Sequence, residues 1–460
     1  MRPRTLEEIA GAVGGRVEGP EATVTRVVTD SREDLTGALF VALPGEHHDG
    51  HGFIEASFEA GAAGAMISRG DGWSGPVVRV ANVGDALMAL AAAERTSFEG
   101  PVVGITGSTG KTTTKDLSRA VLASRFRVHA SPRSFNTEVG VPLTILNAPE
   151  GTEALVLEMG SRGLGHIEML CRSAQPTVGV LTNVGAAHLE MFGSRDTVAR
   201  AKAELVEALP EDGVAILNAD DPVVKRFGEW TTARIISYGL GEGAEVRAGD
   251  VTLDPDARAA FTLSWRGEDA RVELAVTGEH MVPNALAAAA AGLALGGSVA
   301  ECAAALKGAT VSRWRMEVLD RADGVRIVND AYNANPTSMA AALKAARWMA
   351  RDRRCVAVLG EMAELGDAAV EEHDRVGEQV ARLGIDELVT IGELGRVVAR
   401  AATREGVEPG RVRECASAGE ALTALRDLVR PGDVVLIKAS RALGLDRLAS
   451  SLLSGEEGPA

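Results

Sequence analysis

The sequence is poor in aromatic residues: Phe, Trp and Tyr make up 3% of its 460 residues, although 46% are hydrophobic. Its buried cores must therefore consist mainly of aliphatic side chains and alanine. Cysteine is also rare, with four residues at positions 171, 302, 355 and 415, and no two of them form a C-x-x-C pair. This spacing predicts neither a zinc site nor a disulfide scaffold.

Hydrophobic runs of membrane-spanning length are missing too, because the alanine tract at 287–291 is too short to cross a bilayer. Residues 1–19 contain no apolar segment of the signal-peptide type. Positive charge is in deficit: 48 Lys and Arg against 64 Asp and Glu give a net charge of −16. We therefore expect a cytoplasmic protein with no nucleic-acid partner and no stable membrane insertion.

The chain is long enough for several domains. Strand-like and helix-like segments alternate along most of it, which predicts an α/β fold with parallel sheets covered on both faces. Residues 245–277 alternate with a period of two instead, so antiparallel strands are expected there. The pattern divides the chain into three units, at residues 1–98, 99–312 and 313–460.

The strongest motif is GITGSTGKTTTK at 104–115, which follows an apolar run and precedes a helical pattern. Glycines there let backbone N–H groups approach a polyphosphate, Lys111 adds a positive charge, and the Thr112 hydroxyl could bind Mg²⁺. Ile105 stands where the strict G-x-x-x-x-G-K-[ST] pattern has its first glycine. The alternative is an ordinary strand-to-helix turn, but Gly-Lys-Thr-Thr after a strand favours a phosphate loop.

A second glycine pattern, GLGEGA at 239–244, fits the dinucleotide-binding fingerprint G-x-G-x-x-[GA]. That fingerprint requires a helix directly after the glycines. Strand-like residues follow instead, and we reject a dinucleotide site here.

Polar side chains also follow predicted strands. Glu158 and His188 each come after a strand of the second unit, and strand ends there should share an edge with the phosphate loop. A carboxylate at that edge could hold Mg²⁺ together with Thr112. A solvated acid for Glu158 and a hydrogen-bonded loop histidine for His188 remain the alternatives. In the third unit, polar clusters follow Asp330 and Gly360 and occupy 438–441.

These stretches resemble the Mur ligase family. Residues 107–113 are similar to the phosphate loop of Mur ligases and folylpolyglutamate synthases. YNANPTSM at 332–339 and LGEMAELG at 359–366 resemble the branch that adds D-alanyl-D-alanine to a UDP-N-acetylmuramoyl tripeptide. The branch that adds the third residue usually has an Asp-Tyr-Ala-His-Thr-Pro type of stretch at the position of 330–336. Further similar stretches, in family order, are 131–144, 278–285 and 312–317.

The resemblance implies a three-domain Mur ligase architecture: a UDP-sugar-binding N-terminal domain, a central ATP-binding P-loop domain and a Rossmann-like C-terminal domain. It implies ATP-dependent amide ligation through an acyl phosphate, in peptidoglycan precursor synthesis. ATP and Mg²⁺ would be the cofactors, UDP-N-acetylmuramoyl-tripeptide and D-Ala-D-Ala the partners, and the chain a monomer. The sequence departs from the family at Ala439, where Lys-Gly-Ser-Arg is usual, and at Trp314, which interrupts a more usual Gly-Arg pair.

The resemblance also assigns residues to roles. Lys202 falls where related ligases carry a carbamylated lysine, and Arg315 would reach the γ-phosphate. Asn284 would face the adenine and Asp330 the ribose. The catalytic residues would be Lys111, His188, Lys202 and Arg315. The nucleotide-binding residues would be Gly107, Ser108, Thr109, Gly110, Lys111, Thr112, Thr113, Asn284, Arg315 and Asp330. The metal ligands would be Thr112, Glu158, His188 and Lys202. The substrate-binding residues would be Ser31, Arg32, Asp49 and His51 for the UDP part, and Asn136, Thr137, Asn333 and Asn335.

Two other functions remain possible from the sequence. One is a sister amide ligase, either the Mur ligase that adds the third residue or a folylpolyglutamate synthase, and use of a single amino acid would favour it. The other is a P-loop switch or motor, which would turn over ATP without an added amine.

Overall fold

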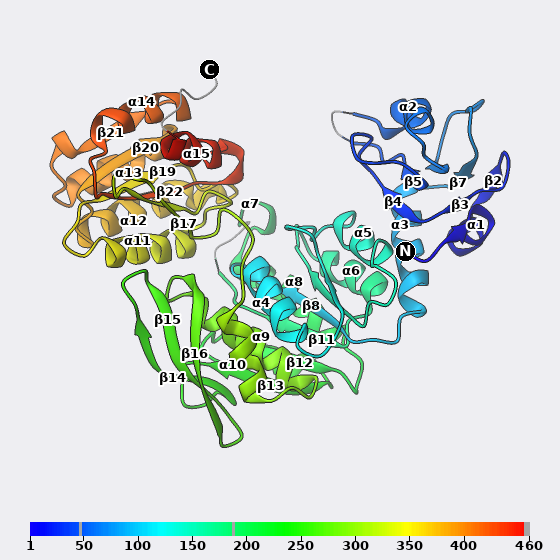
Figure 1. Cartoon of the computed structure of the whole chain (residues 1–460), viewed down its shortest axis with the longest axis horizontal. Coiled ribbons are helices and arrows are strands. Elements are labelled where there is room, and N and C mark those ends of the chain that lie inside the picture. Colours follow the sequence, from blue (N-terminus) through cyan, green and yellow to red (C-terminus); the bar gives the residue numbers. More distant parts are fainter. Residues whose placement is uncertain (46–47, 186–188, 455–460) are drawn as a thin grey trace.

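The computed structural model describes residues 1–45, 48–185 and 189–454. Its strands form sheets of five, nine and six strands, together with a two-stranded pair. Figure 1 shows these three large sheets in three parts of the molecule: the N-terminal part in blue, the central part in cyan and green, and the C-terminal part in yellow to red. Within the described residues, no helix combines the length and apolar character needed to cross a membrane.

The N-terminal part contains a five-stranded sheet in the order β2-β7-β6-β5-β4. Thr5 and Glu8 form a capping box that starts α1, and Gly14, at φ 65°, ends it. Helix α3 leads from this part into the central one. The elements are β1 (Arg4–Thr5), α1 (Leu6–Val13), β2 (Arg16–Glu18), β3 (Thr23–Val24), β4 (Arg26–Val28), β5 (Ala38–Val41), α2 (Ile54–Glu59), β6 (Gly64–Ile67), β7 (Val77–Arg79) and α3 (Val83–Thr96).

The central part is built on the nine-stranded sheet, in the order β16-β15-β14-β13-β12-β11-β8-β10-β9. Along the sheet, each pair of neighbours from β9 through β10, β8, β11, β12 and β13 to β14 is parallel. Strands β14, β15 and β16 pair antiparallel, so the antiparallel strands predicted for 245–277 are confirmed. The elements are β8 (Val102–Thr106), α4 (Lys111–Leu122), β9 (Val128–Ala130), α5 (Gly140–Leu146), β10 (Ala154–Glu158), α6 (His166–Ala174), β11 (Val178–Leu181), α7 (Leu189–Phe192), α8 (Arg195–Glu207), β12 (Val214–Asn218), β13 (Arg234–Gly239), β14 (Val246–Leu253), β15 (Arg258–Trp265), β16 (Glu268–Thr277), α9 (Met281–Ala294) and α10 (Val299–Lys307).

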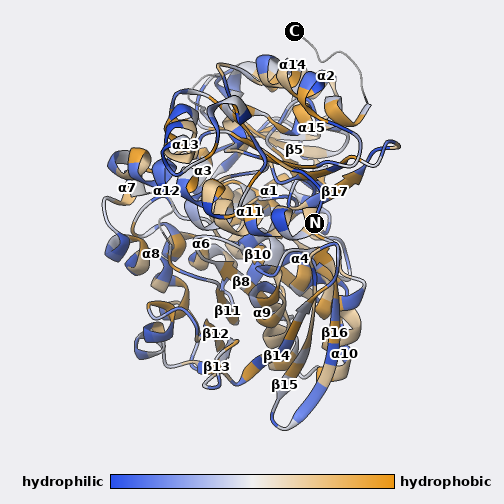
Figure 2. Ribbon diagram, turned by 90° about the vertical axis from the view of Figure 1, so that its left-hand side faces the viewer, coloured by the Kyte–Doolittle hydropathy of each residue, from blue (hydrophilic) through white to orange (hydrophobic). Residues whose placement is uncertain are grey.

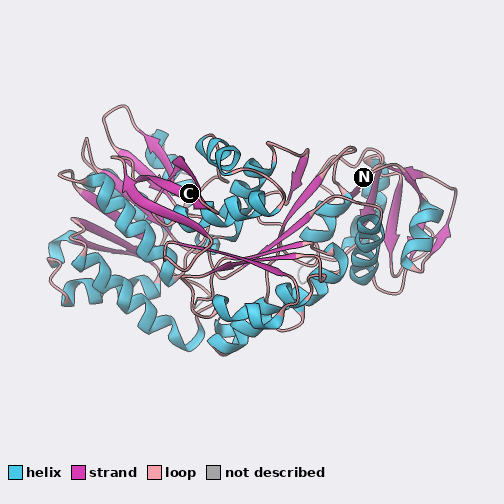
Figure 3. Ribbon diagram, turned by 90° about the horizontal axis from the view of Figure 1, so that it is seen from below, coloured by secondary structure: helices cyan, strands magenta, loops and turns pink. Residues whose placement is uncertain are grey.

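The C-terminal part has a six-stranded sheet in the order β17-β18-β22-β19-β20-β21, parallel except for β17. Figure 1 shows α14 and α15 on one side of this sheet and α11 and α12 on the other, as predicted for a doubly wound fold, and Figure 3 shows helices packed beside strands along the whole molecule. The elements are β17 (Glu317–Asp320), β18 (Arg326–Asn329), α11 (Pro336–Ala350), β19 (Cys355–Leu359), α12 (Ala369–Arg382), β20 (Glu387–Ile391), α13 (Glu393–Arg404), β21 (Val412–Cys415), α14 (Ala418–Leu428), β22 (Val434–Lys438) and α15 (Asp446–Ser454).

The cores are aliphatic, as the composition requires, and the hydrophobic colouring in Figure 2 follows the central strands and α9. The alanine tract at 287–291 is fully buried in α9. Next to it, a Cβ on Gly292 would lie 2.4 Å from a methyl carbon of Val121 in α4. Small residues therefore let α9 pack directly against α4, the helix that follows the phosphate loop.

Candidate active site

The phosphate loop lies between β8, which ends at Thr106, and α4, which begins at Lys111. Gly110 has φ 80°, and a Cβ there would lie 2.3 Å from Oδ1 of Asn284. Only glycine fits this position, for both backbone and steric reasons. The loop delivers its backbone N–H groups to the N-terminus of α4, which is an arrangement that binds anions. At 239–244, by contrast, β13 is followed by strand β14, so the strand predicted after these glycines in place of a helix is confirmed.

Lys111 is half-buried at the start of α4, and its Nζ donates to the carbonyl oxygens of Gly107 (2.7 Å) and Ser108 (3.3 Å). Burial lowers the pKa of Lys111; the Glu158 carboxylate opposes this shift and the Arg315 guanidinium adds to it. The ammonium group is therefore held by the phosphate loop itself and feels the charges of both Glu158 and Arg315.

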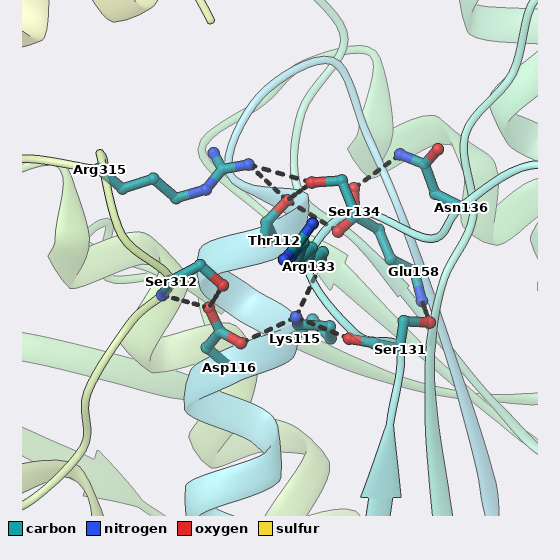
Figure 4. A network of polar contacts seen from close by, with 10 residues as sticks. All are labelled: Thr112, Lys115, Asp116, Ser131, Arg133, Ser134, Asn136, Glu158, Ser312 and Arg315. Carbon is teal, nitrogen blue, oxygen red and sulfur yellow. Dashed lines mark hydrogen bonds and ion pairs between the residues drawn. The ribbon is translucent and has the colours of Figure 1, made fainter. Parts of the chain in front are cut away.

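A chain of polar contacts surrounds Thr112 (Figure 4). Its hydroxyl donates to Oε2 of Glu158 at 2.7 Å and accepts from Nη2 of Arg315 at 2.7 Å. Asn136 Nδ2 donates to the other Glu158 oxygen at 2.8 Å, and Ser134 Oγ lies 3.3 Å from the Thr112 hydroxyl. Thr112 and Glu158 are both buried. A buried hydroxyl and a carboxylate in contact are hard oxygen donors of the kind that Mg²⁺ prefers.

The two remaining predicted metal ligands are Lys202 and His188. Lys202 is buried on α8, where burial and the neighbouring Lys111 ammonium lower its pKa well below the usual value. His188 lies outside the described residues. Among the residues that are described, no three His, Cys, Asp or Glu side chains come together as a metal site. Thr112 and Glu158 are thus the described residues in contact that could hold a metal together with substrate phosphates, a sparse ligand set of a kind that Mg²⁺ often uses.

Residues from the C-terminal part complete the site. The Arg315 guanidinium lies over the Tyr332 ring, 4.2 Å from its centroid. Asp330 accepts from Lys438 Nζ at 2.6 Å and from the Met316 N–H at 3.1 Å. Lys438 also donates to the carbonyl oxygen of Asn333 at 2.8 Å. The ends of β18 and β22 are thereby tied to the segment that carries Arg315.

These groups line one cleft of about 760 Å³ between the central and C-terminal parts. The predicted residues that line it are Ser108, Thr109, Gly110, Lys111, Thr112, Thr113, Asn136, Glu158, Asn284, Arg315, Asp330, Asn333 and Asn335. Gly107, Thr137 and Lys202 do not belong to this lining. The Thr137 hydroxyl accepts from the N–H groups of Val139 and Gly140 at the start of α5. Its substrate role stays a prediction.

The residues predicted for the UDP part lie in the N-terminal part. Arg32 is paired with Asp30 at 2.6 and 2.8 Å, and its side chain is exposed. His51 is buried: its Nδ1 lies 2.7 Å from Asp49, and its Nε2 accepts from the Ser68 N–H at 3.1 Å. These contacts hold the His51 ring between Asp49 of its own loop and Ser68 at the end of β6, and desolvation lowers its pKa. Ser31, which stands between Asp30 and Arg32 in the chain, is half-buried. UDP binding by these residues stays a prediction.

Asn183, Ser134 and Tyr332 line the cleft as well, and none of the three is among the site residues predicted from the sequence. Asn183 holds the phosphate loop, since its Oδ1 accepts from the Thr109 N–H at 3.0 Å and its Nδ2 donates to Thr109 Oγ1 at 2.7 Å. Because Asn183 follows β11 at the carboxyl edge of the sheet, the rule that selected Glu158 could have found it. Tyr332 lies in the stretch YNANPTSM after β18 and Ser134 in the stretch 131–144, so the resemblance of these stretches to the family could have pointed to both.

Trp314 and Ala439, the two departures from the family pattern, differ in backbone conformation. Trp314 adopts φ 62° and Met316 φ 54°, so Arg315 stands between two residues in the left-handed region that favours glycine. The Trp314 ring is covered by the Arg441 guanidinium, 4.5 Å from its centroid. Ala439 is buried at the end of β22 and has no positive φ. Only the Trp314 departure therefore distorts the local backbone.

Comparison with known proteins agrees with this geometry. Residues 105–292 match the Mur ligase middle domain, and residues 314–441 match the Mur ligase, glutamate ligase domain. The UDP-N-acetylmuramoyl-tripeptide–D-alanyl-D-alanine ligase of Mycobacterium tuberculosis H37Rv is 43% identical over 98% of both chains. A crystal structure of MurF from Acinetobacter baumannii has a TM-score of 0.90 at 32% identity and covers 99% of both chains. MurF from Thermotoga maritima, solved in complex with ADP, has a TM-score of 0.81 at 30% identity and covers 94% of this chain and 97% of that one.

Proposed function

This chain belongs to the Mur ligase family, and from that membership we propose that it joins D-alanyl-D-alanine to UDP-N-acetylmuramoyl-tripeptide at the expense of ATP, in peptidoglycan precursor synthesis. The observation that carries the proposal is that Lys111, Thr112, Glu158 and Arg315 line one cleft. The chain also aligns over 98% of its length with a UDP-N-acetylmuramoyl-tripeptide–D-alanyl-D-alanine ligase. A phosphate loop facing an arginine across the cleft suits phosphoryl transfer.

Joining a carboxylate to an amine in water is unfavourable, and ATP makes the reaction possible by phosphorylating the carboxylate. In the proposed reaction, a carboxylate oxygen of the tripeptide attacks the γ-phosphorus, and the bond to the β-phosphate oxygen breaks. Lys111 and Arg315 would offset the charge that develops on the transferring phosphoryl group. The N–H groups of the phosphate loop would hold the remaining phosphates.

In the second step the amine of D-alanyl-D-alanine attacks the acyl carbon, loses a proton and expels phosphate. Asn136, Asn333 and Asn335 line the cleft and would orient the acceptor through amide donors and acceptors. Enclosure between two parts of the chain would keep water from the acyl phosphate, which it would otherwise hydrolyse.

We propose Mg²⁺ as the metal, held by Thr112 and Glu158 with His188 and Lys202 as the further predicted ligands. When bound, the ion would neutralise phosphate charge and polarise the phosphoryl group. Lys202 is suited to carbamylation because its lowered pKa leaves more of the amine neutral, and only a neutral amine adds to carbon dioxide. A carbamate would turn this buried cation into an oxygen ligand.

The proposal extends to the rest of the chain. We propose the N-terminal part, with Ser31, Arg32, Asp49 and His51, as the UDP-binding part, the cytoplasm as the place of reaction, and a single chain as the working unit. The domain limits at 98/99 and 312/313 belong to the same proposal.

The test is the mass of the product formed by the purified chain with ATP, UDP-N-acetylmuramoyl-tripeptide and D-Ala-D-Ala. We expect ADP, phosphate and a product heavier by the dipeptide less one water. ATP turnover that is independent of any amine acceptor would support a P-loop switch instead. A product that forms only with a single amino acid would support a sister ligase.

A further inference from the structure

Helix α4 carries a buried ion pair one turn beyond Lys111. Lys115 and Asp116 lie 2.9 Å apart, with side chains 3% and 9% exposed. Within the described part of the chain, neither belongs to the lining of the cleft. Burying two charges costs desolvation energy, and such a pair is weak evidence for stability. Its connections point to another role.

Lys115 fastens the loop that carries Ser134 and Asn136. Its Nζ donates to the carbonyl oxygens of Ser131 and Arg133, both at 2.9 Å, so with Asp116 all three ammonium hydrogens have acceptors. Arg133 has φ 49°, an unusual conformation for a non-glycine residue. The same loop is tied to the metal-binding carboxylate, because Ser131 Oγ accepts from the Glu158 N–H at 3.1 Å.

Asp116 fastens the connection to the C-terminal part. While one of its oxygens faces Lys115, the other accepts from both the N–H (2.8 Å) and the hydroxyl (2.7 Å) of Ser312, 196 residues away. Ser312 lies three residues before Arg315, whose guanidinium reaches Thr112 and Ser134. Figure 4 shows the resulting ring of contacts around the first turns of α4.

We propose that Lys115 and Asp116 are positioning residues, which hold Arg315 and the Ser134–Asn136 loop in register with Lys111 and Thr112. Both attachments use rigid geometry: the ion pair is buried on a helix, and each carboxylate oxygen has its own partner. Arg315 comes from a segment with two strained residues, so its position depends on an anchor close to it in the chain. The proposal rests on the proposed ligase function and adds residues that never touch the nucleotide.

Asp116→Asn is the central variant. Its amide nitrogen replaces one carboxylate oxygen and is a donor, so the side chain can no longer accept from both Lys115 and Ser312. We expect kcat for ligation to fall by at least about tenfold, since small misplacements of charged groups are costly in rate. The KM for ATP should change by less than about threefold, because the phosphate loop keeps its own contacts. Asp433→Asn is the matched control: Asp433 is also buried and paired with Arg354, at the end of β22 opposite Lys438. It should lose stability while keeping kcat within about twofold.

A double-mutant comparison separates positioning from general destabilisation. If Asp116 acts through Arg315, the Asp116→Asn and Arg315→Lys losses in kcat will not multiply, and the double variant will be close to the poorer single one. Multiplying losses, or a kcat for Asp116→Asn within twofold of the unmodified chain, would overturn the proposal.

Ser312→Ala is the variant to use if Asp116→Asn does not fold. It removes the hydrogen bond from the Ser312 hydroxyl to Asp116 and leaves the hydrogen bond from the Ser312 backbone N–H. Its kcat should fall by about threefold or more, and an unchanged kcat would overturn the proposal. An unmodified chain that makes no dipeptide adduct would refute the proposed function instead, which keeps the two failures distinct.

Discussion

The Arg315 guanidinium donates to the Thr112 hydroxyl at 2.7 Å, although the two residues are 203 positions apart in the chain. Arg315 belongs to the connection that leads into the C-terminal part, and Thr112 to the first turn of the helix after the phosphate loop. The bond places a cation from one part against the proposed metal and phosphate site of another. Substitutions on either side of it should therefore affect the reaction more than the fold.

Lys111→Ala should lower ligation by about 10³-fold or more while leaving the fold intact. Its ammonium contacts two loop carbonyls, and loss of a charge that stabilises the transition state is costly in rate. Removal of a half-buried cation should not cost stability, because desolvation already disfavours the charge. Steady-state kinetics and thermal unfolding of Lys111→Ala, beside the exposed Lys307→Ala control, measure both effects. Near-normal turnover by a folded Lys111→Ala protein would contradict the assignment.

Lys202 should carry a carbamate when bicarbonate is present. The pKa of its amine is lowered well below its usual value by burial and by Lys111, so the neutral form that reacts with carbon dioxide is populated at lower pH than in an ordinary lysine. Carbon-13-labelled bicarbonate should give a carbamate NMR signal that is absent from Lys202→Ala, and that variant should ligate poorly. A plain ammonium in a fully liganded crystal grown with bicarbonate would count against this prediction.

The amine acceptor should be the dipeptide D-Ala-D-Ala and not a single amino acid. A site that pairs the distant carboxylate of the dipeptide leaves polar groups unpaired with free D-alanine, which loses transition-state stabilisation. Asn136 and the backbone near Ala334 are the candidate donors, together with Thr137 if its hydroxyl is free to turn from α5. We expect kcat/KM to be lower by roughly 10⁴-fold for D-alanine. Equal use of D-alanine, L-lysine or meso-diaminopimelate would assign the chain to a sister ligase.

Trp314→Gly should be more stable than Trp314→Ala by about 1 kcal/mol, because both lose the ring but only glycine is unstrained at φ 62°. The order should reverse at Trp348, which lies within α11, where glycine is worse than alanine by about 1 kcal/mol. Free energies of unfolding from urea titrations of the four variants measure both differences. Alanine proving the more stable residue at position 314 would mean that the left-handed backbone is absent in solution.

The sequence was sufficient for features that depend on local pattern. The glycine-rich turn with Lys111 follows from residue order, and the period of two at 245–277 reveals antiparallel strands, because backbone geometry imposes these regularities on neighbouring residues. The alanine tract likewise pointed to a close-packed helix face. Glu158 was found because it ends a strand beside the phosphate loop, and parallel strands bring such ends to one edge.

Only the tertiary structure placed Arg315 on Thr112, Lys438 on Asp330 and the Lys202 amine near Lys111. It also showed that the His51 ring is held by Asp49 and by Ser68 at the end of β6, whereas the sequence left open which groups it contacts. No periodicity records these pairs, because each is set by how separate sheets and helices pack against one another. The sequence supplied the charged and polar groups, and packing between residues 91 to 203 positions apart decided which of them meet.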